Sequence, residues 1–404
     1  EKTGRNITMN MNEQMKESEE SILHTYNRFP VVFEKGQGCY LYDSEGKEYL
    51  DFAAGIAVNS LGYHYPGYDE ALKDQIDKLM HISNLYYNEP IIEAGAKLVK
   101  ASKMSKAFFT NSGTEAIEGA LKAAKKYAYV RDGHADHEII AMNHSFHGRS
   151  IGALSVTGTA HYREPFEPLM GGVKFADFNN LESVKAQITD KTCAIITEVV
   201  QGEGGIYPAK KEFLEGLRQI CDEKDIMLIF DEIQCGMGRT GHYFAWQAYG
   251  VQPDIMTSAK ALGCGVPVGA FVLSEKAAKA SLEPGDHGTT YGGNPFVCAA
   301  VSKVFDIYEN DKIIEHVQEM TPYLEQKLDE IVAKHECAAT RRGMGFMQGI
   351  VIQGRPVGEV VKAALAKGLL VISAGSDVLR IVPPLVITKE HIDKMAAILD
   401  ECME

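Results

Sequence analysis

Short apolar runs alternate with longer helix-like stretches through the middle of the chain. The apolar runs are AFFT from residue 107, EIIAM from 138, CAIIT from 193, IMLIF from 226, DIMT from 254 and GAFVL from 269. Strands that are separated by helices of about 10 to 15 residues are joined by crossover connections, which place them in a mostly parallel sheet. The pattern therefore predicts an α/β fold with a mostly parallel central sheet flanked by helices.

The two ends of the chain follow a different pattern. Residues 1–30 are polar and helix-prone, and a β-like segment with glycine turns follows Pro30. The alternation of strands and helices begins near Tyr68, and a long helical run after Pro295 leads into a C-terminal portion of short strands and helices. We expect three parts, which are an N-terminal segment over 1–67, a large unit over 68–300 and a smaller C-terminal unit over 301–404.

Composition and charge narrow the class of protein. The 404 residues are 45% hydrophobic and 24% charged, which is typical of a soluble globular protein. A net charge of −14 argues against a nucleic-acid partner, because the phosphate backbone is also negative. No apolar run approaches the roughly 20 residues that cross a bilayer, and the N-terminal residues lack the apolar stretch of a secretion signal. We therefore expect a cytoplasmic protein with no membrane partner.

The eight cysteines are scattered along the chain, and none forms a Cys-x-x-Cys pair. This spacing argues against both a zinc cluster and a disulfide framework. We expect a reducing compartment and no metal site.

An acid and an amine follow two of the predicted strands. Asp231 ends the run IMLIF, and Lys260 follows the run that contains Ile255 and Met256. In an open parallel sheet, ligands bind beyond the carboxyl ends of the strands. Taken alone, Asp231 is more simply explained as a helix N-cap. Taken together, the two residues predict a Schiff-base lysine, with the aspartate anchoring the ring nitrogen of pyridoxal phosphate.

Other strand ends carry residues that suit a phosphate, a ring and a carboxylate. After AFFT, Ser112, Gly113 and Thr114 open a helix whose free N–H groups suit a phosphate, although a plain N-cap is the simpler explanation for this element alone. After EIIAM, Phe146 suits stacking on a planar cofactor and Arg149 suits a carboxylate. Core packing and a surface ion pair explain these two residues equally well.

Four further positions follow from the same approach. Glu198 and Glu203 follow CAIIT beside glycines that allow the backbone to approach a ligand. Thr290 lies in the loop HGTTYGGN, which either binds phosphate or is only a tight connection. Arg380 lies inside an apolar strand, where it needs a buried carboxylate partner or a substrate carboxylate.

Seven motifs, spread in order over almost the whole chain, resemble those of the class III pyridoxal-phosphate aminotransferases. They are NSGTEA, SFHGR, EVVQGEGG, DEIQCGMGRTG, SAKALG, HGTTYGGNP and RIVPPLVI. Seven ordered motifs are far more specific than any one of them. The resemblance implies the fold type I of pyridoxal-phosphate transferases, in which the N- and C-terminal segments form a smaller α+β domain. It also implies a homodimer with each active site at the subunit interface.

The resemblance also implies a role for each site residue. Lys260 would carry pyridoxal 5'-phosphate and move a proton during catalysis, while Asp231 holds the ring nitrogen. Phe146 would stack on the ring and Gln234 would lie near its phenolic oxygen. The other implied cofactor residues are Ser112, Gly113, Thr114, His147, Glu198 and, from the other subunit, Thr290. The implied substrate residues are Arg149 for the α-carboxylate, Glu203, Arg380 and Ile56. Arg380 would receive a carboxylate of 2-oxoglutarate and would otherwise pair with Glu203.

Within the family, the chain is most similar to the members that transfer the terminal amine of N-acetylornithine to 2-oxoglutarate in arginine biosynthesis. Members that act on free ornithine usually have a tyrosine where this chain has Ile56, which removes a polar partner for a free amine. Ornithine, 4-aminobutyrate, glutamate 1-semialdehyde and N-succinyldiaminopimelate are the alternative substrates. A non-catalytic binding module is disfavoured because Lys260 and Asp231 are both present.

Overall fold

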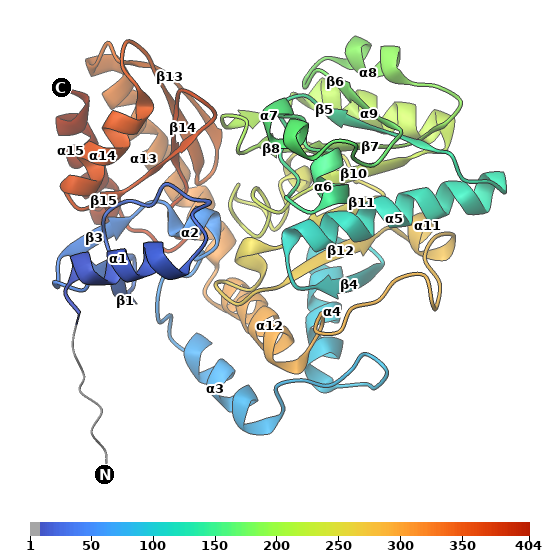
Figure 1. Cartoon of the computed structure of the whole chain (residues 1–404), viewed down its shortest axis with the longest axis horizontal. Coiled ribbons are helices and arrows are strands. Elements are labelled where there is room, and N and C mark those ends of the chain that lie inside the picture. Colours follow the sequence, from blue (N-terminus) through green and yellow to red (C-terminus); the bar gives the residue numbers. More distant parts are fainter. Residues whose placement is uncertain (1–8) are drawn as a thin grey trace.

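A seven-stranded sheet forms the centre of the computed structural model, which describes residues 9–404 (Figure 1). The strand order is β4-β12-β11-β10-β7-β5-β6, and only β12 runs antiparallel to its neighbours. The strands are β4 (Lys106–Thr110), β5 (Glu138–Met142), β6 (Val173–Ala176), β7 (Thr192–Glu198), β10 (Met227–Asp231), β11 (Ile255–Ser258) and β12 (Gly269–Leu273). The predicted mostly parallel sheet is confirmed, and β6 is an edge strand that was not predicted.

Helices cover both faces of this sheet, which is why β7, β10, β11 and β12 are buried at every position and mostly apolar. On one face, α5 (Gly113–Asp132) packs its alanine-rich side against β11 and β12. On the other face, α9 (Lys211–Lys224) packs Phe213, Leu214 and Leu217 against β7 and β10. Successive strand residues alternate between the two cores, so Ile229 joins the α5 side and Leu228 joins the α9 side.

The N- and C-terminal segments share one of the smaller sheets, as predicted. β1 (Phe33–Gln37), β2 (Tyr40–Asp43) and β3 (Glu48–Asp51) are antiparallel, and β15 (Leu369–Leu370) adds to β3 in parallel. A second antiparallel sheet, here named the C-terminal sheet, has the order β13-β14-β17-β16. Its strands are β13 (Ala338–Met344), β14 (Met347–Ile352), β16 (Ile372–Ala374) and β17 (Val378–Ile381). A short hairpin pairs β8 (Val200–Gln201) with β9 (Tyr207–Pro208).

The helical run predicted after Pro295 consists of two helices, α12 (Pro295–Asn310) and α13 (Ile313–Lys334). They are separated at Lys312, which has a left-handed backbone with φ 53°. The boundary expected between residues 300 and 301 falls inside α12, which packs against α3 and α4. The three-part division stays a prediction. The remaining α-helices are α1 (Met11–Ser21), α2 (Ala54–Ala57), α3 (Tyr68–Lys78), α4 (Glu89–Ser102), α6 (Ile151–Ser155), α7 (Ala160–Arg163), α8 (Leu181–Gln187), α10 (Trp246–Tyr249), α11 (Glu275–Lys279), α14 (Val357–Ala366) and α15 (Lys389–Met403).

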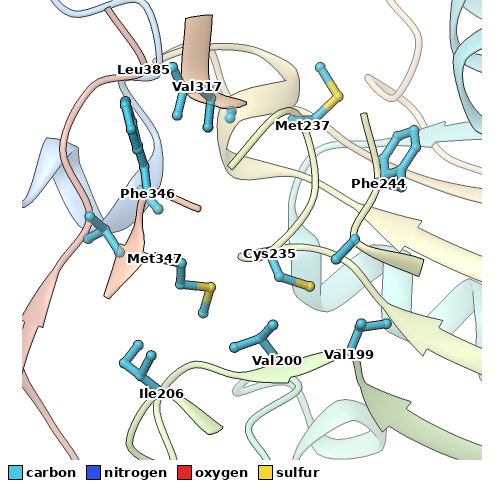
Figure 2. Close-up of a cluster of buried hydrophobic side chains, with 14 of the residues drawn as sticks. Val199, Val200, Ile206, Cys235, Met237, Phe244, Val317, Phe346, Met347 and Leu385 are labelled. Carbon is cyan, nitrogen blue, oxygen red and sulfur yellow. The ribbon is translucent and has the colours of Figure 1, made fainter. Parts of the chain in front are cut away.

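An apolar cluster joins the central sheet to the C-terminal sheet (Figure 2). Val199 and Val200 follow β7, and Cys235 and Met237 follow β10. On the opposite side of the cluster lie residues of the C-terminal part of the chain, namely Val317, Phe346, Met347 and Leu385. This core fixes the carboxyl ends of the central strands against the C-terminal sheet.

Two further expectations concern location. All eight cysteines are free, and all but Cys337 are buried. Within residues 9–404, no helix has the length and apolar character needed to cross a membrane. The cytoplasmic location stays a prediction.

Candidate active site

A cavity of about 540 Å³ opens where the parallel strands of the central sheet end. Segments that follow β4, β5, β7, β10 and β11 meet here because the carboxyl ends of parallel strands share one edge of a sheet. The structure brings together the following predicted residues in the cavity lining: Ser112, Gly113, Thr114, Phe146, His147, Arg149, Glu198, Glu203, Asp231, Gln234 and Lys260. Arg380 lies directly behind this lining, in contact with Glu203 and Gln234.

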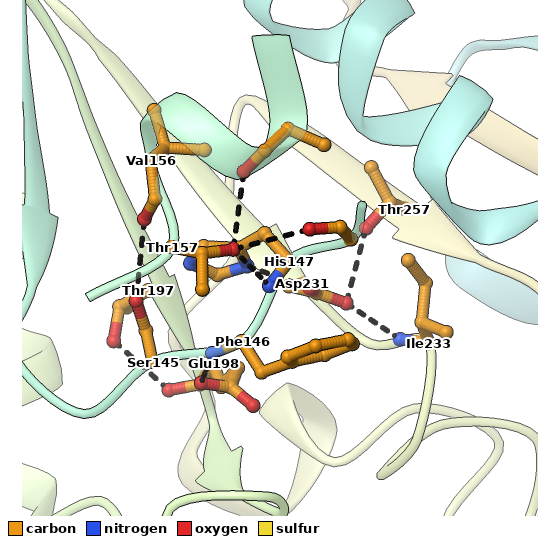
Figure 3. Close-up of polar contacts among 12 residues, drawn as sticks. Ser145, Phe146, His147, Val156, Thr157, Thr197, Glu198, Asp231, Ile233 and Thr257 are labelled. Atoms are coloured by element: carbon orange, nitrogen blue, oxygen red, sulfur yellow. Dashed lines mark hydrogen bonds and ion pairs between the residues drawn. The ribbon is translucent and has the colours of Figure 1, made fainter. Parts of the chain in front are cut away.

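Asp231 is held in one orientation by three hydrogen bonds (Figure 3). Its Oδ2 accepts a bond from His147 Nδ1 at 2.7 Å. Its Oδ1 accepts bonds from the Ile233 N–H at 2.9 Å and from Thr257 Oγ1 at 3.4 Å. Thr257 is the partner of Asp231 in the register of β10 and β11. The buried carboxylate therefore faces the cavity in a fixed position and retains lone pairs for a further donor.

Glu198 lies beside Asp231, because the two residues are paired in the register of β7 and β10. Its carboxyl group is buried and accepts hydrogen bonds from the Phe146 N–H at 3.3 Å and the Gly202 N–H at 3.4 Å. Burial raises the pKa of Glu198 well above its usual range, and the negative charge of Asp231 raises it further. The neutral acid is thereby favoured, and it can donate a hydrogen bond into the cavity as well as accept one.

Lys260 follows β11 and reaches the cavity from a left-handed backbone with φ 48°. Burial lowers the pKa of its amine, and the charge of Arg380 lowers it further, while Glu203 and Asp231 oppose this effect. A lower pKa increases the fraction of free amine, which is the nucleophilic form. A non-glycine residue in this conformation costs about 1–3 kcal/mol, and such strain is concentrated at functional sites.

The N-terminus of α5 forms the part of the cavity that suits an anion. Ser112 caps the helix, and its Oγ accepts a bond from the Glu115 N–H at 3.3 Å. The backbone N–H groups of Gly113 and Thr114 belong to the first turn, where they have no intrahelical acceptor. The helix dipole of a 20-residue helix adds a favourable field for negative charge.

Two arginines flank the cavity in different states. The guanidinium of Arg149 lies over the ring of Tyr162, 4.3 Å from its centroid, and no carboxylate among residues 9–404 forms an ion pair with it. The buried Arg380 forms two bonds to the Glu203 carboxylate, at 2.7 Å and 3.3 Å, and a third to Gln234 Oε1 at 3.2 Å. Arg149 is therefore free to bind a carboxylate, whereas Arg380 is already paired with the carboxylate of Glu203.

The donor set fits pyridoxal phosphate. A fixed carboxylate, Asp231, suits a protonated ring nitrogen, and Lys260 supplies an amine for the aldehyde carbon. The first turn of α5 suits the phosphate, and Phe146 supplies an aromatic ring in the same lining. His147 Nε2 is buried with no partner among the described residues, which indicates that an acceptor or donor is supplied from outside the chain.

Besides Arg380, two predicted residues lie outside the cavity lining. Ile56 lines a separate apolar cavity of about 270 Å³, and Val58 lines the main cavity instead. The reason is a left-handed turn in which all of residues 54–57 have positive φ. Thr290 is exposed on the surface, where it does not reach the cavity of its own chain. The contact of Thr290 with the site of another subunit stays a prediction.

Sequence reasoning missed two residues that support the site. Thr257 was detectable, because it lies in β11 next to the strand that ends in Asp231. Tyr162 had no signal in the sequence, since it lies in the short helix α7 beyond any recognised motif. Both act by holding another side chain rather than by facing the centre of the cavity.

Comparison with known families identifies the family of the chain. The model described as "Aminotransferase class-III" matches residues 22–403. The chain is a class III aminotransferase. The acetylornithine aminotransferase of Clostridium acetobutylicum is 47% identical to it over 388 residues, which cover 96% of this chain and 100% of that protein. The succinylornithine transaminase of Yersinia pseudotuberculosis is 44% identical over 385 residues, which cover 93% and 92%.

Solved structures show the same fold over nearly the full length of this aminotransferase. The ornithine aminotransferase of Toxoplasma gondii, which was crystallised with partial occupancy of PLP at its active site, superposes with a TM-score of 0.93 at 28% identity. The match covers 98% of this chain and 94% of that one. The N-acetylornithine aminotransferase of Stenotrophomonas maltophilia superposes with a TM-score of 0.82 at 36% identity, covering 93% and 96%.

Proposed function

We propose that this aminotransferase transfers the terminal amine of N-acetylornithine to 2-oxoglutarate, with pyridoxal phosphate as cofactor. The products would be N-acetylglutamate 5-semialdehyde and glutamate, as in arginine biosynthesis. The observation that carries the proposal is the pair of arginines at the cavity, of which Arg149 is free and Arg380 is closed by Glu203. The near-full-length similarity to an acetylornithine aminotransferase supports the choice of amine donor.

Asp231 and Lys260 would have different roles in the reaction. When bound, pyridoxal phosphate supplies a ring that withdraws the electrons of the broken C–H bond. Asp231 would keep a proton on the ring nitrogen, since its carboxylate is buried and oriented by His147 and Thr257. Lys260 Nζ would take the proton from the amine-bearing carbon of the substrate and deliver it to the former aldehyde carbon of the cofactor, because its lowered pKa favours the free amine.

Charge explains how one cavity would accept two different substrates. N-acetylornithine carries one carboxylate, which Arg149 would bind, and its acetylated amine is neutral and needs no acidic partner. During that half-reaction Glu203 neutralises Arg380, so that no buried cation is left unpaired. 2-Oxoglutarate carries a second carboxylate, which would replace Glu203 at Arg380. Each substrate thus favours a different state of the same ion pair.

We also propose that the active form is a homodimer. Thr290 is exposed and lies in a loop that contacts the segment 80–87. Asn84 Nδ2 donates to Gly292 O at 2.8 Å, and the rings of His81 and Tyr291 lie 5.3 Å apart. Several apolar side chains of these two segments are exposed. This apolar group consists of Met80, Leu85, Tyr86, Tyr87 and Tyr291, of which Tyr87 is 96% exposed. Apolar side chains gathered in this way mark a protein contact surface. We infer that a second copy covers them and that Thr290 of one copy then contacts the cavity of the other.

A substrate panel tests the proposed function. N-acetylornithine, ornithine, 4-aminobutyrate and N-succinylornithine are each supplied with 2-oxoglutarate, and kcat/KM is compared. N-acetylornithine should give the highest value. N-succinylornithine is the second candidate, because a succinylornithine transaminase is 44% identical to the chain. A clear preference for ornithine or 4-aminobutyrate would overturn the proposal.

A further inference from the structure

The loop at residues 202–206, here named the Glu203 loop, connects β8 and β9 and lies against the C-terminal sheet. Two of its carbonyl groups are bound by that part of the chain. Glu203 O accepts a bond from the Gly375 N–H at 2.9 Å, and Gly205 O accepts one from Arg342 Nε at 2.8 Å. The backbone of the loop is therefore held by contacts that do not involve the Glu203 carboxylate.

The register of the C-terminal sheet explains how two arginines reach one loop. Arg342 of β13 is paired with Gly349 of β14, and Gly349 is paired with Arg380 of β17. Residues directly opposite one another in neighbouring strands lie on the same face of a sheet. A Cβ at Gly349 would lie 3.1 Å from the Cβ of Ile206. The glycine thus leaves room for the Glu203 loop between the two arginines.

The two arginines hold the loop by groups of different kinds. Arg380 binds the side-chain carboxylate of Glu203, which can rotate away and be replaced by another carboxylate. Arg342 binds the backbone carbonyl of Gly205, and its guanidinium lies over the Tyr207 ring, 3.6 Å from the centroid. No carboxylate among residues 9–404 forms an ion pair with Arg342. Glu203 therefore pairs with Arg380 alone, and a substrate carboxylate can replace it there without breaking an ion pair at Arg342.

We propose that Arg342 is a positioning residue for substrate exchange, which rests on the proposed function. It anchors the backbone of the Glu203 loop, so that only the Glu203 side chain moves when Arg380 changes partner. Without this anchor, the Glu203 carboxylate pairs with Arg380 for a smaller fraction of the time. The unpaired Arg380 guanidinium then disfavours binding of N-acetylornithine, whereas 2-oxoglutarate still binds Arg380 directly.

Separate measurement of the two half-reactions tests this role. Arg342→Ala should lower kcat/KM for the N-acetylornithine half-reaction about tenfold, since it removes a hydrogen bond from a charged donor. The 2-oxoglutarate half-reaction should stay within about twofold. Arg342→Lys, which keeps a cation able to donate to Gly205 O, should recover most of the loss.

The matched control is Arg341→Ala. Arg341 precedes Arg342 on β13 but points to the opposite face, where it pairs with Asp329 at 2.7 Å and Glu325 at 3.3 Å. This variant should change neither half-reaction. Hydrogen exchange gives a second readout, because the amides of Gly205 and Ile206 lie in the Glu203 loop. Their exchange should be about tenfold faster in Arg342→Ala and unchanged in the control.

A double variant decides whether Arg342 acts through Glu203. Arg342→Ala combined with Glu203→Ala should use N-acetylornithine no more slowly than Glu203→Ala alone. Losses that multiply, or an equal fall in both half-reactions, would overturn the proposal. If Arg342→Ala does not fold, Tyr207→Ala removes the stacked ring of a 42% exposed residue and should shift the half-reactions in the same direction.

The wild-type protein in the same experiment shows whether the proposed function is wrong, independently of the role of Arg342. Wild-type protein that does not use N-acetylornithine contradicts the proposed function. The ratio of half-reactions in the variants is then measured with the amine donor that the substrate panel identifies. An unchanged ratio with that donor overturns the role of Arg342.

Discussion

Arg149 is held by an aromatic ring rather than by a carboxylate, so removal of that ring should weaken substrate binding. The Cζ of Arg149 lies 4.3 Å from the centroid of the Tyr162 ring and 5.5 Å from that of Phe146. The change Tyr162→Leu keeps an apolar side chain but removes the nearer π face. The guanidinium then loses its preferred position above the cavity, and a substrate carboxylate must order it on binding.

The size of the effect follows from this contact. A cation over an aromatic ring contributes about 0.5–2 kcal/mol, and Tyr162 is partly buried, which gives about 1 kcal/mol. Because 1.4 kcal/mol is a factor of ten, the KM for both substrates should rise about fivefold. In the proposed function, Arg149 would bind a carboxylate away from the reacting carbon, so kcat should stay within about twofold.

Initial-rate kinetics with N-acetylornithine and 2-oxoglutarate varied independently give both constants. Tyr162→Phe keeps the ring and should remain within about twofold of wild type in KM. Tyr129→Leu, at a half-exposed position on α5, is the control for loss of a surface tyrosine. The reasoning is refuted if Tyr162→Leu leaves KM unchanged, or if Tyr162→Phe is impaired as much as Tyr162→Leu.

Two further predictions concern stability. Burial raises the pKa of Glu232 from an ordinary 4.5 to about 7, so between these values the folded protein binds a proton that the unfolded chain has released. The resulting stability is fully present below pH 4.5 and is lost as the pH rises through 7. Between pH 4.5 and about 7, the free energy of unfolding of wild type, measured with urea, should therefore fall by about 3 kcal/mol more than that of Glu232→Gln. Parallel pH dependences of the two proteins would contradict this expectation. Gly119→Ala places a Cβ 2.1 Å from the Phe271 ring and should cost about 1–3 kcal/mol, whereas Gly358→Ala, on an exposed helical turn with no neighbour within 4 Å, should not destabilise. Equal thermal midpoints for the two glycine variants would show that the α5 contact is not tight.

The central sheet and most of the cavity lining were predictable because one geometric rule covers them. Asp231, Glu198 and Lys260 all follow apolar runs, and parallel strands present their carboxyl ends at one edge. The edge strand β6 does not obey the pattern, since it is short, only partly buried and contains Lys174. Its place in the sheet depends on pairing with β5, which no local pattern reveals.

Left-handed backbone at residues other than glycine accounts for two departures from prediction. Lys312 divides the predicted long helical run into two helices without a glycine or proline at the break. Ile56 lies in a left-handed turn that directs it to a separate cavity. L-residues disfavour this conformation by about 1–2 kcal/mol, so tertiary contacts must impose it. Local propensity therefore gives no sign of either turn.

Contacts between distant segments account for the remaining unpredicted features. Arg342 and Gly205 are separated by 137 positions, and their contact depends on how the C-terminal sheet docks on the central sheet. Tyr162 reaches Arg149 through the path of the chain around α6 and α7. The pairing of Arg380 with a carboxylate was predictable in kind, because a buried arginine in an apolar strand requires one.

Lys260 is the residue that we propose to bond to the cofactor, and this bond can be tested directly. Reduction of the protein with sodium borohydride in the presence of pyridoxal phosphate links the aldehyde carbon permanently to the amine that holds it. Peptide mass mapping then identifies the modified lysine. We predict a single pyridoxyl modification on the peptide that contains Lys260, lost in Lys260→Ala. Stoichiometric modification of another lysine, with Lys260 unmodified, would contradict the account.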